Sequence, residues 1–219
     1  MFRNIAIASA GSLALCGAAL PATAAAPGTP QAQAWTIGPI VQGRNYSVGM
    51  PRHPMQSGSS IAIDLPGPTE RDGHVHYVTF NPGSLEGARR IVMRYRIDMD
   101  AGTRIVPREN PRQAAMLSLH FQRRGDNWSG RGEYEAYRWY SPPAKMMPLT
   151  RGTHTVTVSL DENWKAVGRS YAKNNPRAFQ AALRNTGAVG FTLGSRGGRG
   201  HGVYATGPAR MTVLDFRVE

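Results

Sequence analysis

Apolar and polar residues alternate with a period of two in several stretches of this 219-residue chain. The clearest stretch is 91–98, and similar ones occupy 117–122, 155–160 and 213–218. Because successive side chains of a β-strand point to opposite faces, this pattern predicts antiparallel sheets with one buried face. The residues predicted to face the core are Ile91, Met93, Tyr95, Ile97, Leu117, Leu119, Phe121, Val156, Val158, Leu160, Leu214, Phe216 and Val218.

Turn-forming residues such as Asn81-Pro82-Gly83 separate eight predicted strands. The strands are expected at 61–64, 75–80, 90–99, 115–122, 133–140, 153–160, 189–194 and 210–218. One helix interrupts them: Asn175 is suited to its N-cap, Pro176 to its first turn, and Gly187 to its end. The pattern predicts an all-β fold, a two-sheet antiparallel jelly-roll sandwich with one short connecting helix.

The first residues have the layout of a secretory signal peptide. Arg3 gives a positive start, 5–20 is apolar or small, and Ala22-Thr23-Ala24 is a small-x-small cleavage site. The apolar run is short for a membrane span. We therefore predict a signal peptide at 1–24, a disordered lead-in at 25–34 and one β-sandwich domain at 35–219. The mature protein is expected in a bacterial periplasm or outside the cell, without stable membrane insertion.

Cleavage after Ala24 predicts that the exported protein begins at Ala25, since the small-x-small site ends there. N-terminal sequencing of protein recovered outside the cytoplasm checks this. A retained Met1 would contradict the predicted cleavage.

The only cysteine, Cys16, lies in the predicted signal peptide. The mature chain would then lack disulfides, cysteine nucleophiles and thiolate metal sites. The full chain has a net charge of +12, mostly from arginine, which favours an anionic partner. A genome that prefers arginine to lysine would give the same charge. Because export argues against nucleic acid, we expect a glycan partner, and an acidic one.

The second half of the chain resembles a known group of sandwiches. Residues 179–194, a Gly-rich loop and then residues 209–216 look like the closing half of galactose-binding-like jelly rolls. Residues 77–83 and 90–98 resemble the early strands of that group. The resemblance covers most of 75–218 through pattern and spacing. Many carbohydrate-binding modules have this fold, so the resemblance implies a jelly roll that binds a sugar.

The polar face of the predicted strands, together with the loop at 123–132, is the candidate binding site. Aromatic rings stack on sugars, and arginine pairs with carboxylates through two parallel hydrogen bonds, which favours an acidic sugar. The candidate ligand-binding residues are Arg94, Arg96, His120, Gln122, Trp128, Tyr137 and Arg138. Two alternatives stay open: Trp128 anchors the loop from beneath, or the polar face is a solvated outer surface.

No cofactor is expected, and metal sites are secondary candidates. His74 and His76 would project to one strand face as a metal pair does, but zinc needs a third protein ligand. The resemblance also implies a structural calcium in some members. Its donors here would be Asp64, Asp98 or Asp215, and calcium requires several such oxygens in one place.

Sequence motifs for catalysis are missing: there is no Gly-x-Ser-x-Gly and no His-Glu-x-x-His. The Gly-rich segment 194–207 matches no nucleotide-binding motif and is predicted to be a flexible rim loop. Jelly-roll polysaccharide lyases carry Arg-x-Glu-x-Arg, which appears only as the imperfect 131–135. We therefore expect a non-catalytic carbohydrate-binding protein. The alternatives are a lyase or glycoside hydrolase acting on an acidic glycan, and a protein-interaction domain of the cell envelope.

Overall fold

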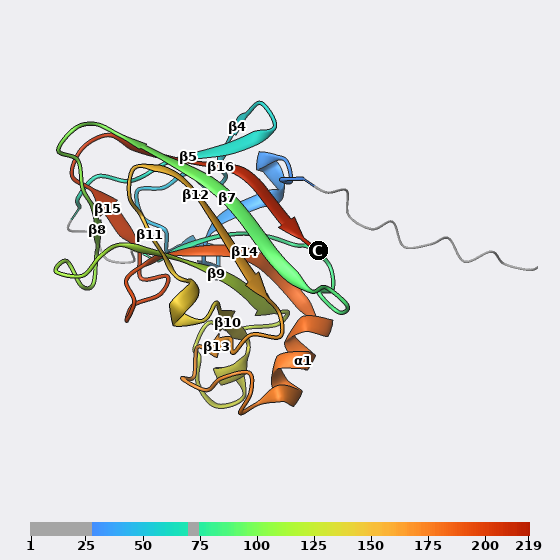
Figure 1. Cartoon of the computed structure of the whole chain (residues 1–219). Coiled ribbons are helices and arrows are strands. Elements are labelled where there is room, and N and C mark those ends of the chain that lie inside the picture. The colour runs from blue at the N-terminus through green and yellow to red at the C-terminus, as the bar shows by residue number, and fades with distance from the viewer. Residues whose placement is uncertain (1–27, 70–74) are drawn as a thin grey trace, which may run out of the picture.

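A computed structural model describes residues 28–69 and 75–219 (Figure 1). This described part is all-β, with one α-helix and several antiparallel sheets. The strands are β1 Trp35–Gly38, β2 Ile40–Val41, β3 Arg44–Asn45, β4 Met55–Ser57, β5 Ser60–Asp64, β6 His76–Phe80, β7 Arg90–Met99, β8 Ile105–Pro107, β9 Met116–Arg123, β10 Arg138–Tyr140, β11 Met147–Pro148, β12 Gly152–Ser159, β13 Lys165–Ala166, β14 Thr186–Gly194, β15 Val203–Ala205 and β16 Ala209–Val218. The helix α1 is Pro176–Arg184, and short 3-10 turns occupy Ala32–Ala34, Gly132–Ala136 and Pro143–Lys145.

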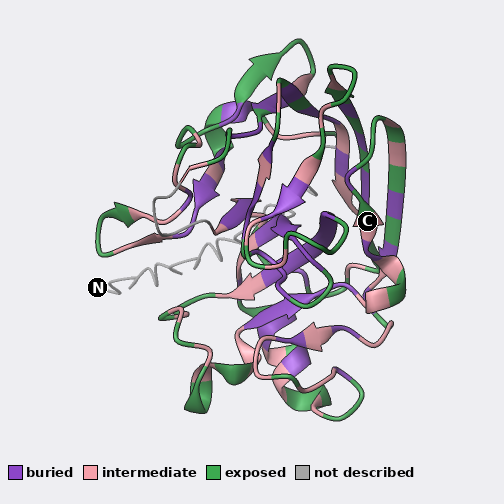
Figure 2. Ribbon diagram, turned by 90° about the vertical axis from the view of Figure 1, so that its left-hand side faces the viewer, coloured by how far each residue is buried: buried purple, intermediate pink, exposed green. Residues whose placement is uncertain are grey.

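Two large sheets form a sandwich-like core. The seven-stranded sheet has the order β1-β6-β14-β9-β10-β13, with β11 beside β9, and the five-stranded sheet has the order β12-β7-β16-β5-β4. Their apolar faces meet, as the edge-on contact between the rings of Trp35 in β1 and Phe216 in β16 shows, with 5.3 Å between centroids. Buried residues gather in the interior and exposed ones at loops and edges (Figure 2). Two-stranded pairs, β15-β8 and β2-β3, complete the described part.

The period-two pattern gave the correct buried face in three of the four stretches. In β7 the predicted bounds are those observed, and Ile91, Met93, Tyr95 and Ile97 are fully buried. The predicted core residues of β9 and β12 are also buried. Alternation is a reliable guide here because each strand has one face on the shared core.

The last strand, β16, departs from strict alternation at Leu214. Its register shifts between Val213 and Asp215, so Leu214 is the additional residue of a β-bulge. Val213 therefore joins Phe216 on the core face, whereas Leu214 is partly exposed. The sequence prediction had Val213 and Leu214 reversed, because one inserted residue inverts the facing of everything before it.

The predicted strand at 133–140 is wrong in its first half. Residues Gly132–Ala136 form a 3-10 turn, and only Arg138–Tyr140 is strand. The turn residues present no apolar face, so a strand there would bury nothing. The turn instead allows Trp139 to enter the core while its indole N–H donates to the Ala136 carbonyl at 2.9 Å. The Trp139 ring is therefore buried without leaving its N–H group unpaired.

The predicted helix is present but ends earlier than expected. Its apolar stripe of Phe179, Ala182 and Leu183 is buried, at the end of the molecule near β9 (Figure 1). The helix ends at Arg184 because Thr186 already begins β14. The Thr186 hydroxyl lies 2.9 Å from the carbonyl oxygens of Ala182 and Leu183, which satisfies acceptors that helix termini leave free.

The packed chain begins a few residues before the predicted boundary at Trp35. Ala32 is buried, and its N–H donates to the Gln56 side chain at 2.7 Å. The Trp35 indole N–H donates to the Pro30 carbonyl at 3.1 Å. The predicted signal peptide at 1–24 lies outside the described residues. Within 28–69 and 75–219, no helix is long and apolar enough to cross a membrane.

Candidate functional site

The face of the seven-stranded sheet that points away from the core is polar, yet it is covered. Ser118 and His120 of β9 and Thr192 of β14 are fully or almost fully buried there. Residues of two loops pack on this face: the Trp128 ring lies 5.1 Å from the Tyr77 ring, and Gly200 approaches the same ring closely. On this sheet the polar face is therefore not the solvated surface that the sequence left as an alternative, whereas the face of β7 that carries Arg94 and Arg96 is exposed.

Two tyrosines and a histidine form the centre of this covered face. The hydroxyl oxygens of Tyr77 and Tyr140 are 2.6 Å apart, and the His120 ring lies against both aromatic rings, with centroids at 4.9 and 5.1 Å. His120 Nδ1 lies 3.1 Å from the Trp139 carbonyl oxygen. Because a carbonyl oxygen only accepts, this contact assigns the imidazole proton to Nδ1.

Electrostatics keep the centre uncharged. Burial, aided by the positive charge of Arg138, lowers the pKa of His120 to about 3. Burial also raises the pKa of both Tyr77 and Tyr140. At neutral pH the imidazole and the two phenols are therefore all neutral, since desolvation disfavours each charged form.

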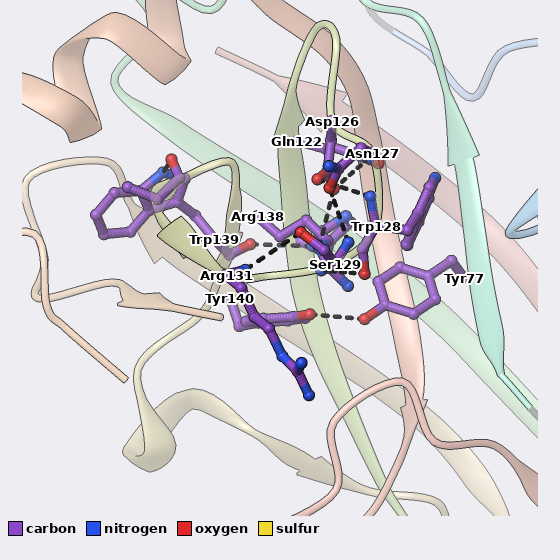
Figure 3. Close-up of polar contacts among 12 residues, drawn as sticks. Tyr77, Gln122, Asp126, Asn127, Trp128, Ser129, Arg131, Arg138, Trp139 and Tyr140 are labelled. Carbon is purple, nitrogen blue, oxygen red and sulfur yellow. Dashed lines mark hydrogen bonds and ion pairs between the residues drawn. The ribbon is translucent and has the colours of Figure 1, made fainter. Parts of the chain in front are cut away.

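Arg138 of β10 joins the covered face to the loop above it (Figure 3). Its Nε lies 2.9 Å from an Asp126 carboxylate oxygen, and its Nη2 donates to the Trp128 carbonyl at 2.9 Å. Gln122 donates to the same carboxylate at 2.9 Å. Burial raises the pKa of Asp126, which the positive charge of Arg138 opposes. This buried ion pair, with its additional hydrogen bonds, fixes the loop on the sheet.

Trp128 has a backbone conformation that tryptophan rarely adopts. Its φ is +67°, in the left-handed region that costs an L-residue about 1 to 2 kcal/mol. The Trp128 N–H donates to Asp126 at 3.0 Å, and the Arg138 guanidinium lies 5.0 Å from the Trp128 ring centroid. The indole also meets Tyr77 edge-on at 5.1 Å. These contacts hold a partly exposed indole in one orientation.

Beside this indole is a cleft of about 420 Å³, which we call the Trp128 cleft. Three aromatic rings, those of Tyr46, Tyr77 and Trp128, contribute to it. Its lining residues are Pro39, Val41, Tyr46, Val75, Tyr77, Asn127, Trp128, Ser129, Arg138 and His201. The rings supply apolar surface, and the amide, hydroxyl and imidazole groups supply hydrogen-bonding partners, a combination typical of small-molecule sites.

The structure brings some predicted site residues together and separates others. His120, Gln122, Trp128 and Arg138 belong to one connected cluster on the seven-stranded sheet. Tyr137 lies outside that cluster, with the Arg123 guanidinium 4.6 Å from its ring centroid.

Arg94 and Arg96 do not join that cluster. They lie on β7 of the five-stranded sheet, on the exposed face away from the core. The expected groove combining them with His120 and Gln122 is therefore not formed. The cause is sheet membership: β7 pairs with β12 and β16, and the core lies between it and β9.

His74, the first residue of the predicted histidine pair, lies outside the described residues. His76 is buried on β6, where its Nδ1 accepts the Val203 N–H at 3.2 Å. Within the described ranges, no group of three or more His, Cys, Asp and Glu side chains is placed to hold a metal ion.

The three carboxylates considered for calcium each face an arginine instead of one another. They lie on strands of the five-stranded sheet. The pairs are Asp64–Arg210 at 2.6 Å, Asp98–Arg96 at 2.8 Å and Asp215–Arg217 at 2.8 Å. Since calcium requires several oxygens converging on one point, these residues do not form such a site.

The site residues predicted from the sequence did not include Tyr46, Tyr77, Tyr140 or Arg199. The available signal was a tyrosine at a strand position that faces away from the core, as Tyr77 does between two buried neighbours. The Gly-rich loop was also misjudged as a flexible rim. Its Arg199 is buried, and a Cβ at Gly200 would lie 2.5 Å from the Tyr77 ring, so the loop packs directly on the sheet.

The arrangement is better suited to binding than to proton transfer. A histidine with a pKa of about 3 is a poor base near neutral pH, and tyrosines with raised pKa values are poor acids. The partly exposed indole and the cleft beside it can contact a ligand, and no proton transfer is needed for that contact. No protein-family model, curated protein or solved structure matches the chain, so a functional assignment depends on this geometry.

Proposed function

We propose that this protein is an exported, non-catalytic carbohydrate-binding domain that holds its glycan in the Trp128 cleft. The observation that carries the proposal is that the partly exposed rings of Tyr46 and Trp128 line one cleft, with Asn127 and Ser129 at the same place. Aromatic rings bind the apolar faces of sugar rings, while amides and hydroxyls bind sugar hydroxyls. The constrained backbone of Trp128 adds support, because strain of this kind gathers at ligand sites.

The fold and location are part of the same proposal. Two large antiparallel sheets with one short helix are compatible with a galactose-binding-like jelly roll. The N-terminal sequence supports export, and the net charge of +12 supports an acidic glycan. With Arg94 and Arg96 on the far sheet, an acidic group would have to be bound elsewhere.

Trp128→Ala should weaken glycan binding at least about tenfold, because an aromatic stacking surface contributes roughly 1.5 kcal/mol or more. A glycan array on the wild type would identify the ligand, and isothermal titration calorimetry would give the two dissociation constants. Arg94→Ala with Arg96→Ala is the matched control on the opposite sheet and should leave the affinity within about twofold. A wild type that binds no glycan, or a Trp128→Ala variant that binds normally, would refute the proposal.

Polysaccharide cleavage is the second candidate function, since Tyr77, His120, Tyr140 and Arg138 converge as the residue types of jelly-roll lyases do. The burial of His120 and its lowered pKa weigh against it. Size-exclusion chromatography of an acidic polysaccharide incubated with the protein separates the two functions. A shortened polymer would show that the protein cleaves the polysaccharide and does not only bind it. A silent array together with capture of an envelope protein would favour the interaction-domain alternative.

A further inference from the structure

Two arginines are buried on the covered face, and among the described residues only one of them has a counterion. Arg138, 7% exposed, pairs with Asp126 at 2.9 Å. Arg199, 8% exposed, donates from Nη1 to the Ser141 carbonyl at 2.8 Å, and its buried Nε has no hydrogen-bond partner. Within residues 28–69 and 75–219, no carboxylate forms an ion pair with Arg199.

The loop that carries Arg199 is held in place on both sides. Gly198 N–H donates to the Ser195 hydroxyl at 2.9 Å, and the Gly200 carbonyl accepts the His76 N–H at 2.9 Å. Gly200 also has a φ of +75° and approaches the Tyr77 ring too closely for any side chain. These contacts fix the backbone on either side of Arg199, and the hydrogen bond from its Nη1 to the Ser141 carbonyl holds the guanidinium.

A second cation lies at the same place. Lys165 of β13 is directly opposite Tyr140 of β10, and the Arg199 guanidinium lies 5.9 Å from the Tyr140 ring centroid. Partial burial lowers the pKa of Lys165, and the positive charges of Arg199 and Arg169 lower it further. Lys165 is more exposed than Arg199 and so marks the side open to solvent. Two neighbouring cations without an acid between them repel each other.

We propose that Arg199 and Lys165 form a binding site for an oxyanion, a carboxylate, sulfate or phosphate group. A buried charge without a partner is unfavourable, and an anion at this point would remove that cost. The Ser141 carbonyl occupies Nη1, which leaves the Nε edge of the Arg199 fork for the anion. Lys165 adds a second positive charge beside Arg199. Neither residue lines the Trp128 cleft, so the site does not depend on glycan binding there.

Isothermal titration calorimetry of the wild type with inorganic sulfate, at constant ionic strength, tests the site. Arg199→Gln should weaken sulfate binding at least about tenfold, and Lys165→Gln severalfold, since hydrogen bonds to charged groups are lost. Arg94→Gln, on the opposite sheet, is the charge-matched control and should bind like the wild type. Absence of sulfate binding by the wild type at millimolar concentrations, or equal affinity in all variants, would overturn the proposal.

The melting temperature provides a second readout. Replacing an arginine with a purely structural role would lower it, whereas replacing an anion-binding arginine should raise it when no anion is present. Without oxyanions, Arg199→Gln should melt at a higher temperature than the wild type, because an uncompensated buried charge is gone. With sulfate the wild type should gain more than the variant. A variant that melts lower under both conditions would assign Arg199 a structural role. If Arg199→Gln does not fold, the variant of the partly exposed Lys165, Lys165→Gln, decides through its sulfate affinity.

Competition identifies the source of the oxyanion. An oligouronate that displaces sulfate from the wild type, but binds Arg199→Gln at least about tenfold more weakly, would place its carboxylate at this site. An oligouronate that leaves sulfate bound would assign the site to a free inorganic anion. Trp128→Ala should retain sulfate binding in either case, so the oxyanion site and the Trp128 cleft can fail independently.

Discussion

Phe216→Asp is expected to leave the protein unfolded at room temperature. Phe216 is 1% exposed, and its ring meets those of Trp35 and Phe80 at 5.3 and 5.5 Å. Truncating a buried phenylalanine costs about 3 to 5 kcal/mol, and a buried carboxylate without a partner adds to that. The sum reaches the whole stability of a typical domain, about 5 to 15 kcal/mol. Far-UV circular dichroism and urea denaturation would measure the loss.

Asp215→Ser is the matched control on the neighbouring residue. Asp215 is partly exposed and pairs with Arg217 at 2.8 Å. Surface ion pairs contribute about 0 to 1 kcal/mol, so this variant should remain folded with nearly the wild-type urea midpoint. Equal effects of the two substitutions would show that the assigned facing of β16 is incorrect.

Acidification should destabilise the protein through His120, beginning below about pH 6.5. The folded-state pKa of about 3 lies below the ordinary value of 6.5, so the unfolded chain binds the proton first. Stability contributed by the neutral imidazole is fully present above pH 6.5 and is lost as the pH falls toward 3. The slope is roughly 1.4 kcal/mol per pH unit, which gives about 2 to 3 kcal/mol between pH 6.5 and 4.5.

Urea denaturation at a series of pH values checks this in the wild type and in His120→Gln. The variant should be less stable at pH 7.5, because it loses packing against Tyr77 and Tyr140. Its stability should fall less steeply with acid, since no group remains there to take up the proton. Thr155→Gln, at an exposed position of the five-stranded sheet without a titrating group, should keep the wild-type slope. Parallel pH profiles for the wild type and His120→Gln would contradict the assignment.

The site was only partly accessible to sequence reasoning. Trp128, Arg138, His120 and Gln122 were predicted from residue type, and they do lie in one cluster. Their chemistry was misjudged, because a polar strand face does not indicate whether loops will bury it. That no described carboxylate pairs with Arg199 was also invisible in the sequence, since it depends on which carboxylates the fold brings near.

The sequence by itself determined the local facing of most strands and the position of the single helix. Alternation in 91–97 and 117–121 records which side of each strand meets the core, a property that successive residues encode directly. Strand partners, the bulge at Leu214 and the covering of His120 were decided only by the tertiary structure. These features depend on contacts between residues far apart in the chain, and identical alternation is compatible with either sheet. Arg94 and His120 were therefore placed on opposite sides of the core by strand pairing, which period-two patterning does not specify.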